Sequence, residues 1–332
     1  MRLLARVFIF AVTLILLSAP DAVLAQTLGP DGAPNPTASV TSERKLLQQG
    51  PRIEGGIDIP DTRAHVLMQP AGRSWDYFHE VLLRRGGAII ILGTIGLLAV
   101  AYLILGRLRI EGGRSGQTVL RFKAFERFSH WLTAVSFVVL GLTGLNITFG
   151  KVVLLPLIGP AAFSDVSQAA KVVHNFTSFA FMLGLFLIVV LFFRDNFPAR
   201  VDIEWVRQGG GFIKHKHAPA GRFNLGEKLV YWLSLAAGVG VSLSGLLLLF
   251  PFQGTNIAEM QLAQIVHAVV AVLFVALILG HIYIGTVGME GAFEAMGTGE
   301  VDVNWAREHH DRWLAQKLAE ERQASTAATP AE

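Results

Sequence analysis

Four histidines lie within long apolar stretches of this 332-residue chain: His130, His174, His267 and His281. The last two share one stretch, QIVHAVVAVLFVALILGHIYIG, at residues 264–285. A titratable ring at membrane depth is costly and needs a partner, so such a histidine indicates a functional site. Because the chain has no cysteine, disulfides, thiolate zinc sites, cysteine-ligated iron–sulfur clusters and covalent c-type haem are excluded. Any metal chemistry would therefore depend on histidine.

The composition is that of an integral membrane protein. Hydrophobic residues make up 52% of the chain and charged residues only 16%, a balance that soluble domains of this length rarely show. The net charge of +3 is small, and the basic residues lie between the apolar runs. We interpret them as topology signals, with the lipid bilayer as a partner and no nucleic-acid surface.

Apolar runs of roughly 20 residues, each long enough for a membrane-spanning helix, predict an all-α membrane protein. There are five of them, at about 86–106, 129–149, 173–193, 229–250 and 264–286. We expect a four-helix core over 129–286 and one additional N-terminal transmembrane helix at 86–106.

The N-terminus predicts export. The sequence MRLLARVFIFAVTLILLSAPDAVLAQ has two early arginines, an apolar core and a small-residue cleavage site ending at Ala25, which is typical of a signal peptide. An uncleaved signal anchor is the alternative. We expect residues 26–85 to be periplasmic and mostly irregular, with one short helix near SWDYFHEVL. Partner docking and a disordered linker are both open for residues 26–82.

Charge in the connections predicts the orientation. The connections after the first and third runs are strongly basic, whereas the one after the fourth run, PFQGTNIAEMQLA, has no lysine or arginine. The positive-inside rule therefore places the loop at 107–128 and the tail at 287–332 in the cytoplasm. Arg84 and Arg85 run against the rule but are outnumbered.

This topology pairs the histidines by depth. His130 and His281 would lie near the inner face, and His174 and His267 near the outer face. The 14 residues from His267 to His281 fall only about 40° short of four full helical turns, so both rings leave one stripe, about 21 Å apart. Facing imidazoles at equal depth are what the two axial positions of a haem iron require. The pattern predicts two b-type haems that conduct electrons between the membrane faces.

Other interpretations of the histidines are weaker. A proton relay or transporter site would usually add acidic residues within the helices, and none lies there. Tetrahedral zinc would need its ligands closer together. Small residues that allow close approach of a macrocycle, or equally of another helix, are Gly141, Gly144, Gly238, Gly240 and Gly245.

Several segments, in order and spacing, resemble the cytochrome b (gamma) subunit of membrane-bound formate dehydrogenase. They are RFSHWLTAVSFVVLGLTG, KVVHNFTSFAF, RFNLGEKLVYW, the stretch at 264–285 and VNWAREHHDRW. The resemblance covers about residues 120 to 320, and it implies the same histidine pairing for two haem b groups.

The resemblance also implies a quinone site on the cytoplasmic side, for menaquinone or ubiquinone, in a stretch reading Asn-x-Gly-Gln-Lys. Here the stretch is Asn224, Leu225, Gly226, Glu227 and Lys228. Glutamate in place of glutamine makes Glu227 a candidate proton donor to the reduced quinone. Asn224 also suits a helix N-cap, and the two roles are compatible.

The implied partners are a periplasmic molybdopterin-containing catalytic subunit, which oxidises formate, and an iron–sulfur subunit. The chain would then be a multi-pass subunit of a bacterial inner membrane complex, with no formate chemistry of its own. A cytochrome b subunit of a hydrogenase or of a sulfur-compound reductase is an alternative, and a haem-free scaffold or transporter is another. For Trp305, His309, His310 and Trp313 in the tail we expect an interfacial amphipathic helix. His65, His79, His215 and His217 receive no role.

Overall fold

The computed structural model describes residues 53–56, 66–69, 72–211, 218–251 and 253–328. The predicted signal peptide lies outside the described residues, as do His65, His215 and His217. Among those described, five helical segments are long and apolar enough to cross a membrane: Ser74–Leu105, Ala124–Val153, Leu155–Phe192, Leu225–Leu249 and Ile257–Gly288. The predicted all-α membrane architecture with five spans is confirmed.

The first span joins three consecutive helical segments: α4 (Gly72–Tyr77), the π-helix η1 (Phe78–Gly86) and α5 (Gly87–Leu105). The short helix expected near SWDYFHEVL therefore forms and continues directly into the membrane span. Helix α5 ends at Leu105, and the next residue, Gly106, has a φ of 68° that suits glycine. Before α4, β1 (Ile53–Gly56) and β2 (Val66–Gln69) form an antiparallel pair.

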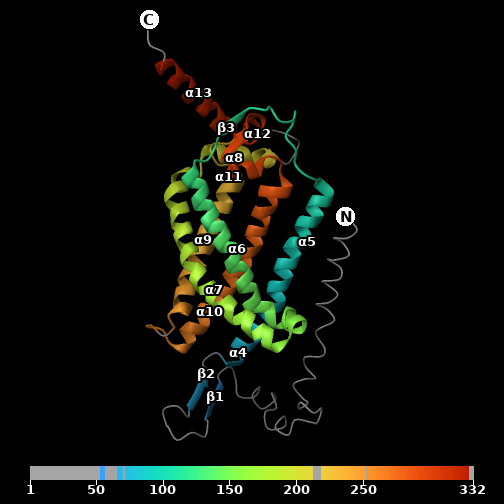
Figure 1. Ribbon diagram of the computed structural model, residues 1–332, viewed down its shortest axis with the longest axis vertical. Coiled ribbons are helices and arrows are strands. Elements are labelled where there is room, and N and C mark those ends of the chain that lie inside the picture. Colours follow the sequence, from blue (N-terminus) through green and yellow to red (C-terminus); the bar gives the residue numbers. More distant parts are fainter. Residues whose placement is uncertain (1–52, 57–65, 70–71, 212–217, 252, 329–332) are drawn as a thin grey trace.

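The core consists of two helical hairpins. One pairs α6 (Ala124–Val153) with α7 (Leu155–Phe192), and the other pairs α9 (Leu225–Leu249) with α10 (Ile257–Tyr283), which continues into η4 (Ile284–Gly288). The first span packs beside α10 through Leu83, Ile91 and Val272 (Figure 1). Many large apolar side chains face outwards, as lipid-facing surfaces require.

The connection expected between the second and third spans is helical. Helix α6 runs on to Val153, and α7 begins two residues later at Leu155. A kink at Gly159, with φ 77° just before Pro160, turns the chain. Alanines at 161, 162, 169 and 170 favour the helix that follows, a preference that the sequence interpretation overlooked.

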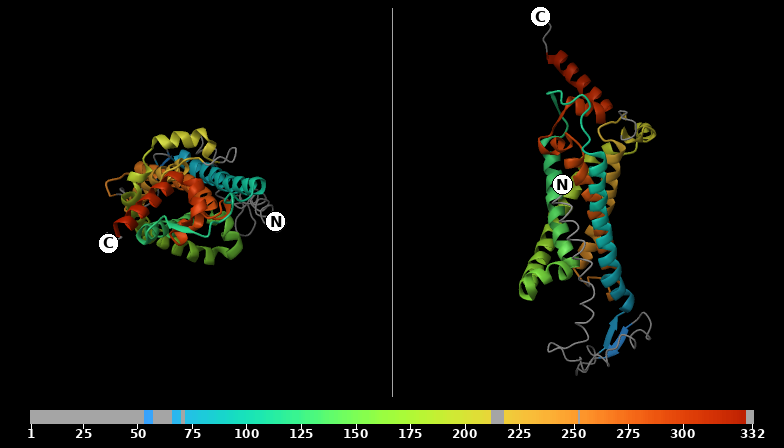
Figure 2. Two further views of the ribbon diagram at one scale, coloured as in Figure 1. Left: turned by 90° about the horizontal axis from the view of Figure 1, so that it is seen from above. Right: turned by 90° about the vertical axis from the view of Figure 1, so that its right-hand side faces the viewer.

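A cap of short elements covers the end of the bundle at which α9 begins. It contains β3 (Thr118–Leu120), η2 (Arg194–Asn196), α8 (Arg200–Arg207), η3 (Gly209–Gly211), α11 (Ala292–Gly297), β4 (Glu300–Asp302), α12 (Val303–His309) and α13 (Asp311–Ala328). Strand β3 pairs with β4 in antiparallel register, Val119 opposite Val301. Figures 1 and 2 show the cap elements at the end opposite β1 and β2, with α13 projecting beyond them.

The prediction of an interfacial amphipathic helix in the tail is wrong. Trp305, His310 and Trp313 are buried, and the two tryptophans belong to one apolar cluster with Phe122 and Phe192. The physical reason is that the inner loop supplies a partner surface, β3 and Phe122, against which the apolar side of the tail can pack. The tail thus closes the bundle instead of lying on the membrane surface.

Candidate functional site

The inner pair of histidines comes from α6 and α10. His130 lies two turns into α6, and His281 lies near the end of α10. Their ring centroids are 6.2 Å apart, with 58° between the ring planes. His130 is half-buried, and its buried Nδ1 has no hydrogen-bond partner among the described residues.

The outer pair comes from α7 and α10. His174 and His267 have ring centroids 6.2 Å apart and ring planes at 69°. The structure therefore brings together the two pairs that the topology argument predicted. One helix, α10, supplies a ring to each pair from one stripe.

The spacing of each pair fits an ion between two imidazoles. With metal–nitrogen bonds of about 2.0 Å, the centroids of two coordinating imidazole rings lie roughly 6.3 Å apart. The 6.2 Å separations agree with that value. No group of three or more histidine, aspartate or glutamate side chains that could hold a metal occurs in the described part of the chain. A two-imidazole donor set suits the axial positions of a haem iron and does not suit tetrahedral zinc.

An aromatic layer fills the space between the two pairs. Phe137, Phe181 and Phe274 follow a ligand by seven residues on α6, α7 and α10, and Phe274 also precedes His281 by seven. Phe137 and Phe274 have centroids 4.7 Å apart, and Phe181 lies 6.3 Å from each. The bundle core between the two sites is therefore packed with apolar rings.

Some of the five glycines lie beside histidine rings, and others lie at contacts between helices. A Cβ at Gly144 would lie 3.5 Å from the His174 ring, and one at Gly245 would lie 3.2 Å from the His267 ring. A Cβ at Gly240 would instead meet Val270 across the α9–α10 contact, and one at Gly238 would meet Leu185. Gly141 faces open space within 4 Å. Gly144 and Gly245 thus make room for histidine rings, while Gly238 and Gly240 serve helix packing.

The stretch that resembles a quinone site begins α9 at the capped end of the bundle. Asn224 is the N-cap, as expected, and its Oδ1 accepts a hydrogen bond of 3.0 Å from the Glu227 amide. Glu227 Oε2 in turn accepts one of 2.9 Å from the Asn224 amide. Glu227 Oε1 accepts a hydrogen bond of 2.9 Å from Arg121. Glu227 is held as the carboxylate partner of an arginine, an arrangement that the sequence interpretation did not foresee.

Arg121 and His310 were not singled out as site residues, and both lie against Glu227. The Arg121 side chain is 1% exposed and lies over the rings of Trp305 and Trp313. His310 Nε2 lies 3.6 Å from Glu227 Oε1. Burial lowers the pKa of Arg121 although Glu227 opposes that shift, and burial with the nearby Arg121 charge keeps the pKa of His310 well below its usual value. Trp305 and Trp313 lie on different helices, because α12 ends at His309 and α13 begins at Asp311, so no single helical stripe in the sequence marks them as buried.

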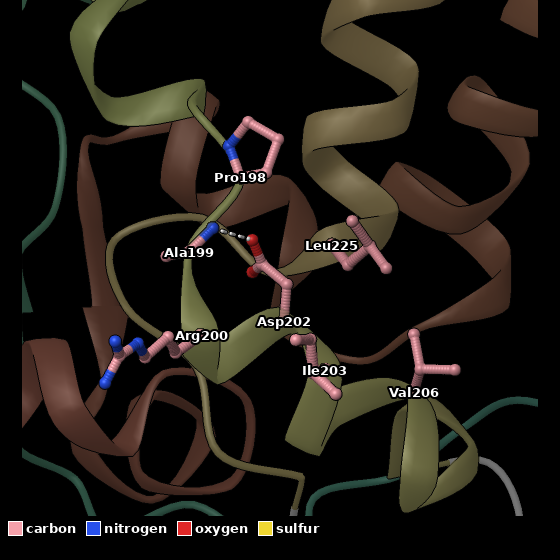
Figure 3. A pocket seen from close by; sticks show the side chains of 7 residues that line it. All are labelled: Pro198, Ala199, Arg200, Asp202, Ile203, Val206 and Leu225. Atoms are coloured by element: carbon pink, nitrogen blue, oxygen red, sulfur yellow. Dashed lines mark hydrogen bonds between the residues drawn. The ribbon is translucent and has the colours of Figure 1, made fainter.

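An open pocket of about 420 Å³ adjoins the start of α9. It lies between α8 and Leu225, the residue between Asn224 and Gly226, and Figure 3 shows Ile203, Val206 and Leu225 around it. Asp202 lines the pocket and accepts a hydrogen bond of 2.7 Å from the Ala199 amide.

Comparisons with known proteins agree with this geometry. The chain is 28% identical over 200 residues to the formate dehydrogenase cytochrome b556(fdo) subunit of Escherichia coli K12, covering 59% of this chain and 92% of that protein. It is 25% identical over 200 residues to the nitrate-inducible cytochrome b556(Fdn) subunit of the same strain, covering 59% and 89%. It is 26% identical over 205 residues to the cytochrome b556 subunit of Haemophilus influenzae formate dehydrogenase, covering 60% and 84%.

These similarities confirm the resemblance to formate dehydrogenase cytochrome b subunits. The family model described as prokaryotic cytochrome b561 matches residues 121–299, which is more than half of the chain and includes all four paired histidines. A membrane cytochrome b implies haem b, and the facing imidazoles fit that group. The chain belongs to the prokaryotic cytochrome b561 family.

Proposed function

We propose that this chain is the di-haem b membrane anchor subunit of a formate dehydrogenase complex. In this role it carries electrons from a periplasmic iron–sulfur subunit, across two haems, to quinone near the cytoplasmic face. The observation that supports it most directly is the presence of two facing histidine pairs of equal spacing in one bundle.

Each pair would hold one haem b. His174 and His267 would supply the axial nitrogens on the outer side, and His130 and His281 those on the inner side. Haem bound in this way supplies a one-electron carrier. The residues of this chain set the spacing, because the two levels differ by 14 residues of α10, or about 21 Å. Phe137, Phe181 and Phe274 exclude water from the space between them.

Quinone would bind at the inner end, near Asn224, Gly226 and Glu227. The pocket lined by Ile203, Val206 and Leu225 supports this location, since an isoprenoid tail needs an apolar surface. The Glu227 carboxylate and the buried Arg121 guanidinium would provide polar contacts for a quinone headgroup. In this arrangement Glu227 accepts from Arg121 and anchors it, and the neighbouring His310 Nε2 has no hydrogen-bond partner in the part of the chain that the structure describes.

The complex would lie in a bacterial inner membrane, with the N-terminus of this chain periplasmic and its C-terminus cytoplasmic. A molybdopterin-containing catalytic subunit would oxidise formate outside, and the iron–sulfur subunit would link it to the outer pair. Proton release outside and quinone protonation from inside would then separate charge. If the chain instead belonged to a hydrogenase or a sulfur-compound reductase, the genes for that enzyme would be expected to lie next to its own gene.

Haem content tests the proposal. We expect about two non-covalent haems per purified chain, by extraction and by reduced-minus-oxidised spectra. Replacing any one of the four paired histidines by alanine should leave about one. His79→Ala is the matched control, since that ring is exposed and lies beside Glu80 and Trp75. Absence of haem from the intact protein, or two haems in His174→Ala, would contradict the ligand assignment.

A further inference from the structure

Both histidines of the outer pair contact the same two-residue motif, a hydroxyl residue followed by a glycine. On α6 the motif is Thr143–Gly144, and on α9 it is Ser244–Gly245. In each case the hydroxyl residue contacts Nδ1 of a histidine on the neighbouring helix, and the glycine lies beside the same ring. A hydroxyl followed by a glycine thus seats His174 and His267 in equivalent ways.

The hydrogen bonds of Thr143 assign the proton of His174. Two backbone carbonyls lie within reach of the single Thr143 hydroxyl hydrogen, that of Val139 at 2.7 Å and that of Leu140 at 3.1 Å, and the hydroxyl donates to them. The oxygen of Thr143 must therefore accept in its 2.9 Å contact with His174 Nδ1. Nδ1 then carries the proton, and the Nε2 lone pair is free to coordinate an ion.

Ser244 does the same for His267. Its Oγ donates to the carbonyl of Gly240, at 2.7 Å, and accepts from His267 Nδ1, at 3.1 Å. Ser244 is 5% exposed, so water does not compete for this bond. The two outer rings therefore present the same tautomer.

The glycines let the rings approach the helix backbones closely. A Cβ at Gly245 would lie 3.2 Å from His267 Cε1, tighter than most Cβ contacts, and one at Gly144 would lie 3.5 Å from His174 Cε1. The His267 ring position that allows the Ser244 contact therefore favours glycine at residue 245, whereas the space beside His174 would admit a Cβ at residue 144 in ordinary contact.

The inner pair differs. His130 Nδ1 is buried and has no hydrogen-bond partner among the described residues. A hydrogen bond from the non-coordinating ring nitrogen raises the basicity of the coordinating one and fixes the ring orientation. His130 therefore lacks the side-chain contact that both outer ligands make.

We propose that Thr143 and Ser244 are positioning residues that fix the Nδ1–H tautomer of the outer ligands and lower the reduction potential of the outer haem. The potential falls because more basic axial imidazoles favour the ferric over the ferrous iron. This inference rests on the proposed function, in that the outer pair must hold a haem. Neither hydroxyl would touch the iron.

Potentiometric titration of the purified full-length protein, followed optically, tests the inference. In Thr143→Val and in Ser244→Ala, the midpoint potential of one haem should rise while that of the other stays unchanged. Thr143→Ser, which keeps a hydroxyl, should restore the wild-type value. Thr94→Val is the matched control, since Thr94 on α5 makes the same bond to the carbonyl four residues earlier, at 2.8 Å, and contacts neither pair. His174→Ala identifies the spectrum of the inner haem.

The outcomes separate the two proposals. Absence of haem from the wild-type protein would defeat the proposed function itself. Two haems with unchanged potentials in both Thr143→Val and Ser244→Ala would overturn the positioning role alone. Loss of the outer haem from Thr143→Val with full retention in Thr143→Ser would support the role, whereas loss from both variants would show that a hydroxyl at residue 143 does not hold the site and would overturn the inference.

Discussion

At the scale of single residues, the outer site depends on what surrounds each ligand as much as on the ligand. His267 contacts Ser244 through Nδ1 and lies against the Cα of Gly245. A histidine with neither feature could rotate out of line with its partner. The identity of the four ligands was predictable from the sequence, but the contribution of these neighbours depends on contacts between helices.

Gly245→Val should lower the content of the outer haem without changing that of the inner haem. Even a Cβ would lie 3.2 Å from His267 Cε1, so the branched side chain must displace the ring. We expect haem content to fall from about two per chain towards about one, as measured by extraction. Gly93→Val on α5, where no atom lies within 4 Å, is the control. Equal haem loss in both variants would mean a general folding defect.

At the scale of elements, one ion pair fastens α8 to α9. Lys228 Nζ contacts both oxygens of Asp202, at 3.0 and 2.8 Å, and each side chain is 7% exposed. Asp202 also accepts from the Ala199 amide at the start of α8. This pair holds α8 beside the first turn of α9, where the pocket and the candidate quinone residues lie.

Asp202→Asn should destabilise the protein by about 3–5 kcal/mol, because it leaves the buried Lys228 ammonium without a countercharge. The asparagine keeps an oxygen for the Ala199 amide, so the capping contact is retained. Adding Lys228→Met should recover most of the loss, since no buried charge then remains. Thermal unfolding in detergent or nanodiscs measures both variants. A double variant no more stable than Asp202→Asn would show that the pair is not the cause.

At the scale of the whole molecule, the loop between α5 and α6 and the C-terminal tail form one cap. Strand β3 from the loop pairs with β4 from the tail, and Phe122, Val301, Trp305 and Trp313 share a core. His310 lies inside the cap, with Nδ1 3.0 Å from the Gly221 carbonyl. The charged and titratable groups around it are Arg121, Glu227 and His309. Its neutral ring is therefore part of the packed cap.

The stability of the cap should fall as the pH drops below about 6.5. Burial and the Arg121 charge hold the pKa of His310 well below its usual value, whereas the unfolded chain binds this proton near pH 6.5. The unfolded state thus binds a proton that the folded state does not bind. The free energy of unfolding therefore falls by up to about 1.4 kcal/mol for each unit by which the pH decreases.

Proteolysis of the tail between pH 7.5 and 5.5 measures this effect. His310→Asn, whose amide can still donate to Gly221, should flatten the pH dependence. The exposed His79→Asn should leave it unchanged. An unaltered pH slope in His310→Asn would exclude His310 as its source.

The sequence by itself determined the five membrane spans, the two levels of histidine and their pairing. Span length follows from bilayer thickness, and ligand depth follows from helix rise and the direction of each span. These are local or one-dimensional properties. The Asn224 N-cap was predictable for the same reason, since the cap bonds only to the next turn.

Only the tertiary structure decided what the ligands and charges contact. The hydroxyls of Thr143 and Ser244 reach histidines 31 and 23 residues away, and Arg121 reaches Glu227 106 residues away. The tail was misinterpreted because Trp305 and Trp313 suit a membrane surface and a protein core equally well. Which surface they cover depends on the inner loop folding over the same end of the bundle, a long-range packing event that leaves no periodic signal in either segment.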